Sequence, residues 1–377
     1  MAATTTDAIQ HRRGAQYIRL LLIFVPLAVV LDRIDSLSPA IRFGCAALAI
    51  IPLSAELVYS TEQIAHRTSQ TLGGLLNATF GNAPELIISL MALQAGLLDV
   101  VKASLVGVML GNLLFVLGLA FLVGGLKHRV QKFNRRGARM QRSILMVAAI
   151  SIVVPSVFDN FIPPDLHDAE DALNIGIAIV LLLTYTMSLL FMLKTHPDYF
   201  SDADGGGEEA GASSWSLRRA LIVLLASSVA LAFMSEIVVD AIAGTAAALG
   251  VSRAFIGVIV LALIGGAPES VAAVTMARKN KLDLTMGIAV GSSIQIALFI
   301  APMLMLSSYV LAPRPLNLMV GNAGIMIVLF PVLLISTVVG DGKSNWFKGV
   351  QLLSVYALIA LFCYYMPDNA TTPLFPP

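Results

Sequence analysis

Charged residues are scarce in this chain of 377 residues. Only 12% of the residues are charged, whereas 57% are hydrophobic and the mean hydropathy is +0.84. Soluble globular domains usually carry about a quarter charged residues. A formal net charge of +1 also excludes a strongly basic surface of the kind that binds nucleic acid. The composition therefore predicts a polytopic membrane protein.

Cysteine is nearly absent, with two residues in the whole chain. Cys45 and Cys363 both lie in apolar runs, so we expect two small buried side chains and no disulfide framework. The chain also lacks an H-E-x-x-H zinc motif, a nucleophile elbow and a phosphate-binding loop. These absences argue against an enzyme and against an organic cofactor.

Long apolar runs are what the chain has instead. A spanning helix needs about 20 mainly apolar residues. Eleven stretches qualify as candidate spans: 17–34, 41–59, 71–97, 103–125, 143–161, 172–193, 217–241, 254–277, 284–307, 316–339 and 349–366. The first run resembles a signal peptide, but Asp32 and Arg33 follow it without a cleavage pattern, so we expect an uncleaved anchor.

Basic residues set the expected orientation. Seven cations lie in sixteen residues between the fourth and fifth spans: Lys127, Arg129, Lys132, Arg135, Arg136, Arg139 and Arg142. The positive-inside rule assigns this loop, and with it the N-terminus, to the cytoplasm. The acidic stretch 159–171 then falls outside. The short chain without a targeting extension predicts a prokaryotic plasma (inner) membrane.

Two short segments are near copies of each other, G-N-A-P-E at 81–85 and G-G-A-P-E at 265–269. The match extends further, because Leu98-Asp99 lies 14 residues after the first glutamate and Leu282-Asp283 lies 14 after the second. The segments fall in the third and eighth spans, so the repeat unit is five helices, inserted in opposite senses. Such inverted repeats are typical of secondary transporters that alternate access to a midplane site.

The duplication predicts an all-α chain with an additional N-terminal helix and two inverted five-helix repeats. The predicted parts are the N-terminal tail and first helix (1–37), the first repeat (38–193), an acidic cytoplasmic linker (194–216) and the second repeat (217–377). The linker lacks the ligand set of an EF-hand. We expect it to be solvated, with weak calcium attraction as the alternative.

Each copied segment puts a carboxylate, Glu85 or Glu269, inside an apolar span. An ionised carboxylate there is costly and needs a cation, a proton or a partner. Pro84 and Pro268 lack an amide hydrogen and are expected to break each helix, freeing backbone carbonyls. The small residues Gly81, Gly265 and Gly266 allow close helix packing at the same level.

The oxygen atoms near these segments form a candidate metal site. The donors are the carboxylates of Glu85 and Glu269 with Asn82, and in the following helices Asn112, Ser292, Ser293 and Gln295. Hard oxygen donors suit calcium better than magnesium or manganese, and soft metals are disfavoured. Burial and a neighbouring like charge favour the protonated carboxyl when the metal is absent. A carrier that moves only when loaded with metal or protons performs antiport.

Several residues keep more than one interpretation. Glu85 and Glu269 could be interhelical hydrogen-bonding residues, although two in duplicated contexts are hard to explain that way. Asn112 and Gln295 could link helices instead of binding metal. Three carboxylates near helix ends are candidates for an access path or for simple solvation: Glu56, Glu62 and Glu236. Asp99 and Asp283 begin helices, where the helix dipole favours them.

These motifs resemble those of the Ca²⁺/H⁺ antiporter (CAX) family within the calcium/cation antiporter superfamily. The resemblance covers about 51–362 and is carried by 81–86, 107–118 with Asn112-Leu113-Leu114, Ser235-Glu236 and 291–296. It implies eleven helices, two inverted repeats, an acidic linker, and a calcium or proton site. By position, that site comprises Glu85 and Glu269 with Asn82, Asn112, Ser292 and Gln295.

The chain departs from the family pattern at four positions. Gly266 stands where the family usually has asparagine, Ser270 where it commonly has histidine, and Val108 and Gly111 where serine is frequent. The site therefore has fewer oxygen donors, and the identity of the cation stays open. The rival within transport is a sodium- or potassium-linked cation exchanger. A weaker rival of another class is an intramembrane enzyme using both glutamates as acid and base.

Overall fold

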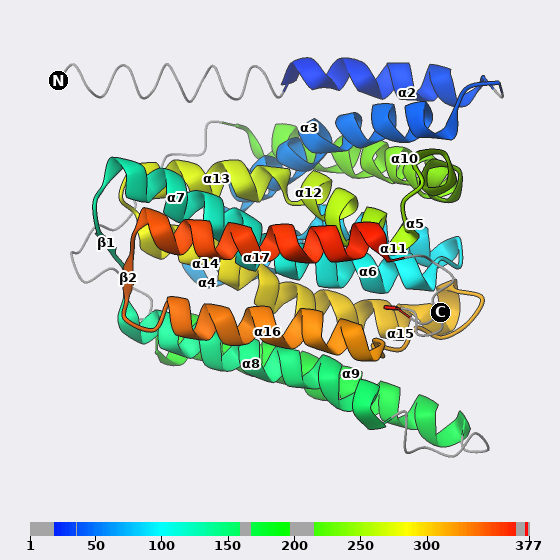
Figure 1. Cartoon of the computed structure of the whole chain (residues 1–377). Coiled ribbons are helices and arrows are strands. Elements are labelled where there is room, and N and C mark those ends of the chain that lie inside the picture. Colours follow the sequence, from blue (N-terminus) through cyan, green and yellow to red (C-terminus); the bar gives the residue numbers. More distant parts are fainter. Residues whose placement is uncertain (1–18, 35, 159–166, 197–214, 367–373, 376–377) are drawn as a thin grey trace.

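The computed structural model describes residues 19–34, 36–158, 167–196, 215–366 and 374–375. The described part is helical apart from two short antiparallel strands, β1 (Gln131–Lys132) and β2 (Lys343–Ser344). Most of the helices run nearly parallel or antiparallel to one another, with both strands at the left end of the molecule in Figure 1. The predicted all-α class is confirmed. The acidic linker lies largely outside the described residues, as does most of the 159–171 stretch.

The first half of the chain contains η1 (Leu21–Ile23), α2 (Phe24–Asp32), α3 (Pro39–Ala65), α4 (Gln70–Phe80), α5 (Ala83–Gln94), α6 (Leu98–Leu110), η2 (Gly111–Val116), α7 (Leu117–Lys127), α8 (Arg135–Phe158), α9 (His167–Leu190) and η4 (Phe191–Thr195). The second half contains α10 (Leu217–Leu249), α11 (Arg253–Phe255), η6 (Ile256–Leu261), α12 (Ala262–Gly265), α13 (Ala267–Arg278), α14 (Leu282–Gln295), η7 (Ile296–Ile300), α15 (Ala301–Leu311), α16 (Asn322–Val338) and α17 (Trp346–Tyr365).

Helix length and composition identify fewer spans than the sequence predicted. Within the described residues, seven helices are long and apolar enough to cross a membrane, or eight if the bent pair 253–265 and 267–278 is one span. Three other apolar helices are shorter, at 21–32, 83–94 and 322–338. The predicted third span is divided at Gly81-Asn82, and the tenth begins at Asn322 instead of Leu316. The count of eleven therefore stays a prediction.

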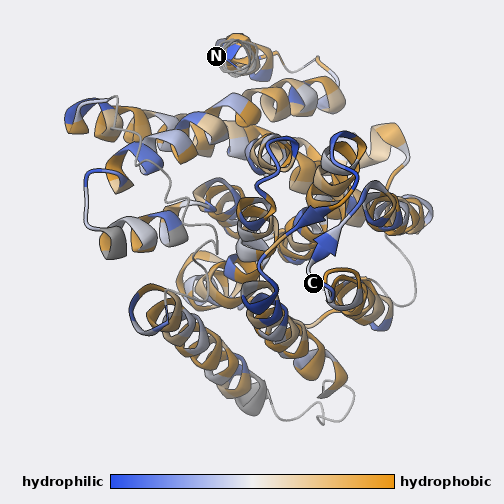
Figure 2. Ribbon diagram, turned by 90° about the vertical axis from the view of Figure 1, so that its left-hand side faces the viewer, coloured by the Kyte–Doolittle hydropathy of each residue, from blue (hydrophilic) through white to orange (hydrophobic). Residues whose placement is uncertain are grey.

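Apolar side chains cover the outside of the bundle as well as its interior. Exposed examples include Val180, Leu183, Leu225 and Phe233 on α9 and α10. Figure 2 shows hydrophobic helices behind a hydrophilic end that carries β1 and β2. An apolar exterior is the expected surface of a helical protein surrounded by lipid. Cys45 and Cys363 are buried thiols with no disulfide, which confirms their expected role as small core residues.

The hydrophilic end is held together by polar contacts between loops, and we call it the basic end. The carboxamide of Gln131 donates to the Ala277 carbonyl at 2.8 Å and to Asn280 Oδ1 at 2.9 Å. These contacts join the loop before α8 to the loop before α14. We call the other end, where α5 leads into α6 and α10 into α11, the opposite end.

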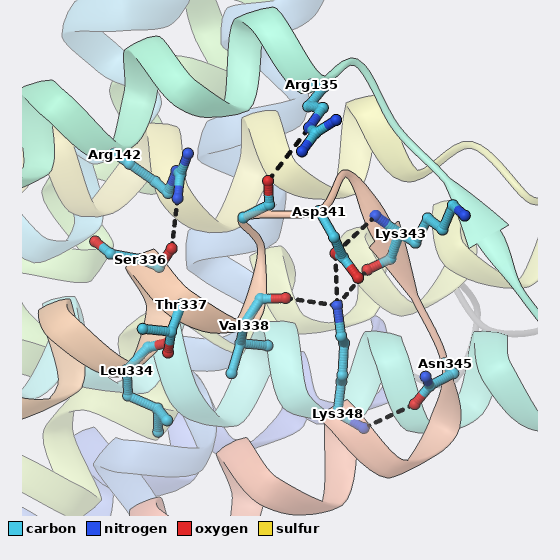
Figure 3. Close-up of polar contacts among 11 residues, drawn as sticks. Arg135, Arg142, Leu334, Ser336, Thr337, Val338, Asp341, Lys343, Asn345 and Lys348 are labelled. Carbon is cyan, nitrogen blue, oxygen red and sulfur yellow. Dashed lines mark hydrogen bonds and ion pairs between the residues drawn. The ribbon is translucent and has the colours of Figure 1, made fainter.

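Figure 3 shows a second set of contacts at the basic end, between α16 and α17. The ammonium of Lys348 donates to Asp341 Oδ1 at 2.7 Å and to the carbonyls of Val338 and Lys343 at 2.7 and 2.8 Å. Arg142 on α8 donates to the Ser336 carbonyl. Burial acts to raise the pKa of Asp341, but the hydrogen bonds and the charge of Lys348 outweigh it and hold this pKa below its usual value.

Candidate cation site

Both copied segments interrupt a helix. α4 ends at Phe80 and α5 begins at Ala83, while α12 ends at Gly265 and α13 begins at Ala267 after a bend of 58°. Pro84 and Pro268 lie in the first turn of the new helix, where a missing amide hydrogen is tolerated. The break predicted from the two prolines is confirmed. Glu85 and Glu269 lie in the same first turns, at the positive end of the helix dipole.

The two copied segments are 184 residues apart in the sequence, and the fold brings Gly265 of the second beside Glu85 of the first. Glu85 is only 4% exposed, and neither of its carboxylate oxygens has a hydrogen-bond partner in the described structure. Glu269 is half-buried, and its Oε2 also lacks a partner there. A Cβ added to Gly265 would lie 3.4 Å from Glu85 Oε1, so this glycine leaves room for the carboxylate. Buried carboxylate oxygens without donors are suited to bind a cation or a proton.

Four residues with candidate oxygen ligands form one hydrogen-bonded network beside the carboxylates. Asn82 donates to Gln295 Oε1 and accepts from the Ser292 hydroxyl. Asn112 Nδ2 donates to Ser292 Oγ at 3.1 Å. These residues come from both halves of the sequence, so the hydrogen-bonded network links the two copied regions. Ser293 does not join it, because its hydroxyl donates to the carbonyl of Ala289 at 2.9 Å.

Gly266 lies next to this hydrogen-bonded network. A Cβ at Gly266 would be 3.6 Å from Asn112 Oδ1. The small residue therefore brings the α12–α13 break against the amide of Asn112. Gly81 has a different reason to lack a side chain, since a Cβ there would meet the carbonyl of Asn77 one turn earlier.

A cavity of about 200 Å³ leads to the site from the basic end. It is lined by Val58, Glu62, Asn77, Gly81, Asn82, Pro268, Glu269, Ala272, Gly287, Ile288, Ser292 and Gln295. The lining runs from Asn82 and Gln295 in the interior to Glu62 near the end of α3. Glu269 therefore faces an open path, whereas Glu85 is not among the lining residues.

Glu85 instead faces a small cavity of about 10 Å³ on the other side of the site. Its lining residues are Glu85, Ile88, Ser89, Ser104, Leu105, Val108, Leu261, Gly265 and Ile296. This volume is close to that of a single water position. The two carboxylates thus differ in access: one borders an open cavity and the other a nearly closed one.

The three candidate access residues have different surroundings. Glu62 is exposed and lines the open cavity. Glu56 accepts from Arg19 Nε at 2.7 Å, and Glu236 is exposed on α10 outside that lining. Only Glu62 of the three is placed on the path to the site.

Local helix widening marks the helices that carry the accessory donors. A π-helical segment begins at Gly111, next to Asn112, and another begins at Ile296, next to Gln295. A third, η6, precedes the break before Glu269. π-Helical turns inside α-helices are frequent at functional sites. These segments contain no proline and no adjacent pair of glycines, so no feature of the sequence predicts them.

Sequence reasoning missed three polar residues that line the two cavities and one buried lysine elsewhere in the bundle. Asn77 lines the open cavity, and Ser89 and Ser104 line the small one. Lys102 on α6 is 3% exposed, and its ammonium donates to Asn317 Oδ1 at 2.6 Å. A charge or amide inside an apolar run is the signal that could have found Asn77 and Lys102. The serines carry no such signal, since single serines are frequent in spanning helices.

Comparison with known proteins agrees with this architecture. The model of the sodium/calcium exchanger protein family matches residues 38–194 and 219–365, which is most of the chain. The chain belongs to this family. Its members are membrane transporters and not enzymes, and the resemblance to Ca²⁺/H⁺ antiporters is confirmed.

Two curated relatives of this exchanger-family chain are Ca²⁺/H⁺ antiporters. The protein of Aphanothece halophytica is 38% identical over 359 residues, covering 92% of this chain and 96% of the relative. ChaA of Bacillus subtilis is 40% identical over 348 residues, covering 91% of this chain and 98% of the relative. The solved structure of native YfkE has 37% identity and a TM-score of 0.80, covering 93% of this chain and 100% of that one. The H⁺/Ca²⁺ exchanger CAX shares the fold, with a TM-score of 0.70 at 13% identity.

Proposed function

We propose that this chain is a secondary active transporter that exchanges Ca²⁺ for H⁺ by alternating access. The observation that carries the proposal is the meeting of the two copied helix breaks, where Gly265 of the second break leaves room for the buried, unpartnered carboxylate of Glu85, and Glu269 lines the cavity beside it. The names of the relatives at 38% and 40% identity support calcium and protons as the exchanged ions.

In this proposal the two glutamates bind the cation or protons in turn. Asn82, Asn112, Ser292 and Gln295 supply neutral oxygens, and water from the open cavity completes the coordination that calcium prefers, six to eight oxygens. Within the described residues no group of three or more His, Cys, Asp or Glu comes together. The negative charge of the site then comes from the two glutamates, which balances one divalent ion or two protons.

Coupling follows from the unequal energies of the loaded and empty states. Two bare carboxylates in an apolar interior repel each other and are poorly solvated, so the site crosses between its two accessible states only when a cation or protons neutralise it. Exchange is then obligatory, because movement of the empty, fully ionised site is the slow step.

The proposal includes a layout in the membrane. Eleven spans are arranged as one N-terminal helix and two inverted repeats, with the broken pair α4–α5 counted as one span and α16 as a short one. The basic end lies in the cytoplasm, because the positive-inside rule places its arginines and lysines there. The N-terminus is then cytoplasmic, and the membrane is the prokaryotic plasma membrane.

Calcium flux in proteoliposomes tests the function. Acid-inside liposomes holding the purified protein are expected to take up calcium, and the uptake is expected to vanish when the pH gradient is removed. Glu85→Gln and Glu269→Gln should each reduce uptake to the level of empty liposomes. Asp240→Asn, which removes an exposed carboxylate on α10, serves as the control and should transport normally. Normal proton-driven uptake by either glutamine variant would refute the proposal.

The second candidate is a sodium- or potassium-linked exchanger on the same scaffold. The observation that favours it is the reduced set of oxygen donors, with Gly266, Val108 and Gly111 in place of polar residues. The same liposomes distinguish the two. Calcium uptake that follows a sodium or potassium gradient and ignores the pH gradient would select the second candidate.

A further inference from the structure

The two cavities beside the carboxylates correspond to each other through the internal duplication. Glu85 is copied at Glu269, 184 residues later, and the same shift relates the linings of the two cavities. The pairs, small cavity first, are Glu85 with Glu269, Ile88 with Ala272, Ser104 with Ile288, Val108 with Ser292, Leu261 with Asn77, and Gly265 with Gly81. One cavity is therefore the counterpart of the other, on the opposite side of the site.

A tight helix crossing accounts for the difference in size. Toward the opposite end, α6 packs against η6, and a Cβ at Gly107 would meet the backbone of Val258. A Cβ at Gly257 would lie 2.6 Å from the Cβ of Ala103. The backbones of α6 and η6 therefore lie close together on this side of the site.

The corresponding crossing at the basic end is open. Ala103 and Gly107 correspond to Gly287 and Gly291 on α14, and a Cβ at either glycine would have no atom within 4 Å. Gly287 instead lines the open cavity. The same structural unit thus occurs once with its helices in contact and once with them apart.

We propose that the small cavity is the closed form of a second access path, and that Ser89 and Ser104 are the polar residues through which Glu85 exchanges ions with the opposite end. This inference rests on the proposed function, since it assigns further residues to the same transport cycle. When α6 and η6 separate, the site opens beside Glu85 as it now opens beside Glu269.

The hydroxyls are suited to this role by position and by chemistry. Their oxygens are 3.5 Å apart, and they share the small cavity with the two carboxylate oxygens of Glu85 that have no hydrogen-bond partner. Ser104 donates to the Val101 carbonyl at 3.1 Å, which leaves its oxygen lone pairs available to a cation or a water molecule. The remaining lining side chains are apolar.

The two paths therefore differ in their polar residues. Ser89 and Ser104 correspond to Ala273 and Ile288, which carry no hydroxyl. The open cavity instead has Ser292, where the small one has Val108. A substitution of the two serines should consequently affect exchange at one end of the molecule only.

Cysteine labelling tests the geometry. In a background with Cys45→Ala and Cys363→Ala, Ser104→Cys and its counterpart Ile288→Cys are treated with a membrane-impermeant thiol reagent from either side. Ile288→Cys should react from the basic end. Ser104→Cys should react from the opposite end, and faster while the protein is turning over. Ala120→Cys, buried in α7, should react from neither side. Labelling of Ser104→Cys from the basic end, or its failure to react during turnover, would overturn the inference.

Transport by the double variant Ser89→Ala, Ser104→Ala tests the chemistry. The exchange rate should fall about ten-fold, the factor expected when a hydrogen bond to a charged group is lost. The concentration of calcium, added at the basic end, that gives half-maximal exchange should not change. Ser60→Ala is the matched control, because that serine is buried too and its hydroxyl donates to the carbonyl three residues earlier, Leu57 at 2.8 Å, as Ser104 does to Val101.

The outcomes separate the two proposals. A double variant with the wild-type exchange rate, measured beside an inactive Glu85→Gln, overturns the role of the serines and leaves the proposed function intact. If Glu85→Gln itself exchanges calcium for protons, the proposed function fails. The labelling pattern is informative in either case, since it does not depend on which ion is carried.

Discussion

Replacing Asn82 by alanine is expected to weaken calcium binding strongly. Its carboxamide is used at both ends, since Nδ2 donates to Gln295 and Oδ1 accepts from Ser292. The change removes one candidate oxygen ligand and releases two more from the positions in which it holds them. Loss of a hydrogen bond or ligand contact to a charged group is worth about 1.5–3 kcal/mol. The concentration of calcium needed for half-maximal uptake should therefore rise by roughly 10- to 150-fold.

The control is Asn77→Ala, which removes the same chemical group from the same cavity. Asn77 lies one turn before the break, and its side chain makes no hydrogen bond within the described structure. We expect the calcium concentration for half-maximal uptake by this variant to change by less than about three-fold, since substitutions of exposed residues usually change the free energy by no more than about 0.5 kcal/mol. Uptake against calcium concentration in acid-inside proteoliposomes measures both variants. Equal losses in the two variants, or wild-type affinity in Asn82→Ala, would refute the reasoning.

Two further predictions concern packing and pH. Gly107→Val should lower the thermal unfolding temperature, because the new side chain meets the backbone of Val258 and overpacking costs about 1–3 kcal/mol. Gly176→Val should leave the unfolding temperature unchanged, because a Cβ at Gly176 has no atom within 4 Å. In the Asp341–Lys348 pair, the pKa of Asp341 is lowered in the folded state. The pair therefore stabilises the fold at pH values above the unfolded pKa of about 3.9, and this stabilisation is lost as pH falls through the folded pKa. Asp341→Asn should thus be less stable than wild type at pH 7, by at most about 1 kcal/mol because the carboxylate is 55% exposed, and the gap should narrow as pH falls through the folded pKa of Asp341.

The sequence predicted the parts of the site that follow from local chemistry. The prolines after Asn82 and Gly266 cannot continue a helix, so both breaks could be located without coordinates. The copied glutamates identified the two segments, and their apolar surroundings showed that the carboxylates needed a partner. Cys45 and Cys363 followed from the apolar runs around them in the same way.

What depends on which helix faces touch could not be predicted. Ser89 and Ser104 lie on different helices, and only the packing of α5 against α6 brings them to one cavity with Glu85. Glu56 was a candidate access residue by its position, but Arg19 from a distant segment pairs with it. Ser293 was named beside Ser292 among the possible oxygen donors, but its hydroxyl donates within α14 to the Ala289 carbonyl, whereas the Ser292 hydroxyl donates to Asn82.

Span counting was limited by a different physical cause. A broken helix such as α4–α5 can cross a membrane while neither piece is long enough by itself, so hydropathy of the sequence and length of the helices give different numbers. Helix ends also depend on the surroundings. α8 begins at Arg135, well before its apolar run, because loop contacts at the basic end hold its charged first turns.

Proton release on calcium binding tests the central claim most directly. The claim is that one metal ion and protons compete for Glu85 and Glu269. Calcium added to the purified protein in weakly buffered detergent solution should release protons, sodium should release none, and a Glu85→Gln, Glu269→Gln double variant should release none with either ion. Undiminished proton release by that double variant, or calcium binding to wild type without proton release, would contradict the account.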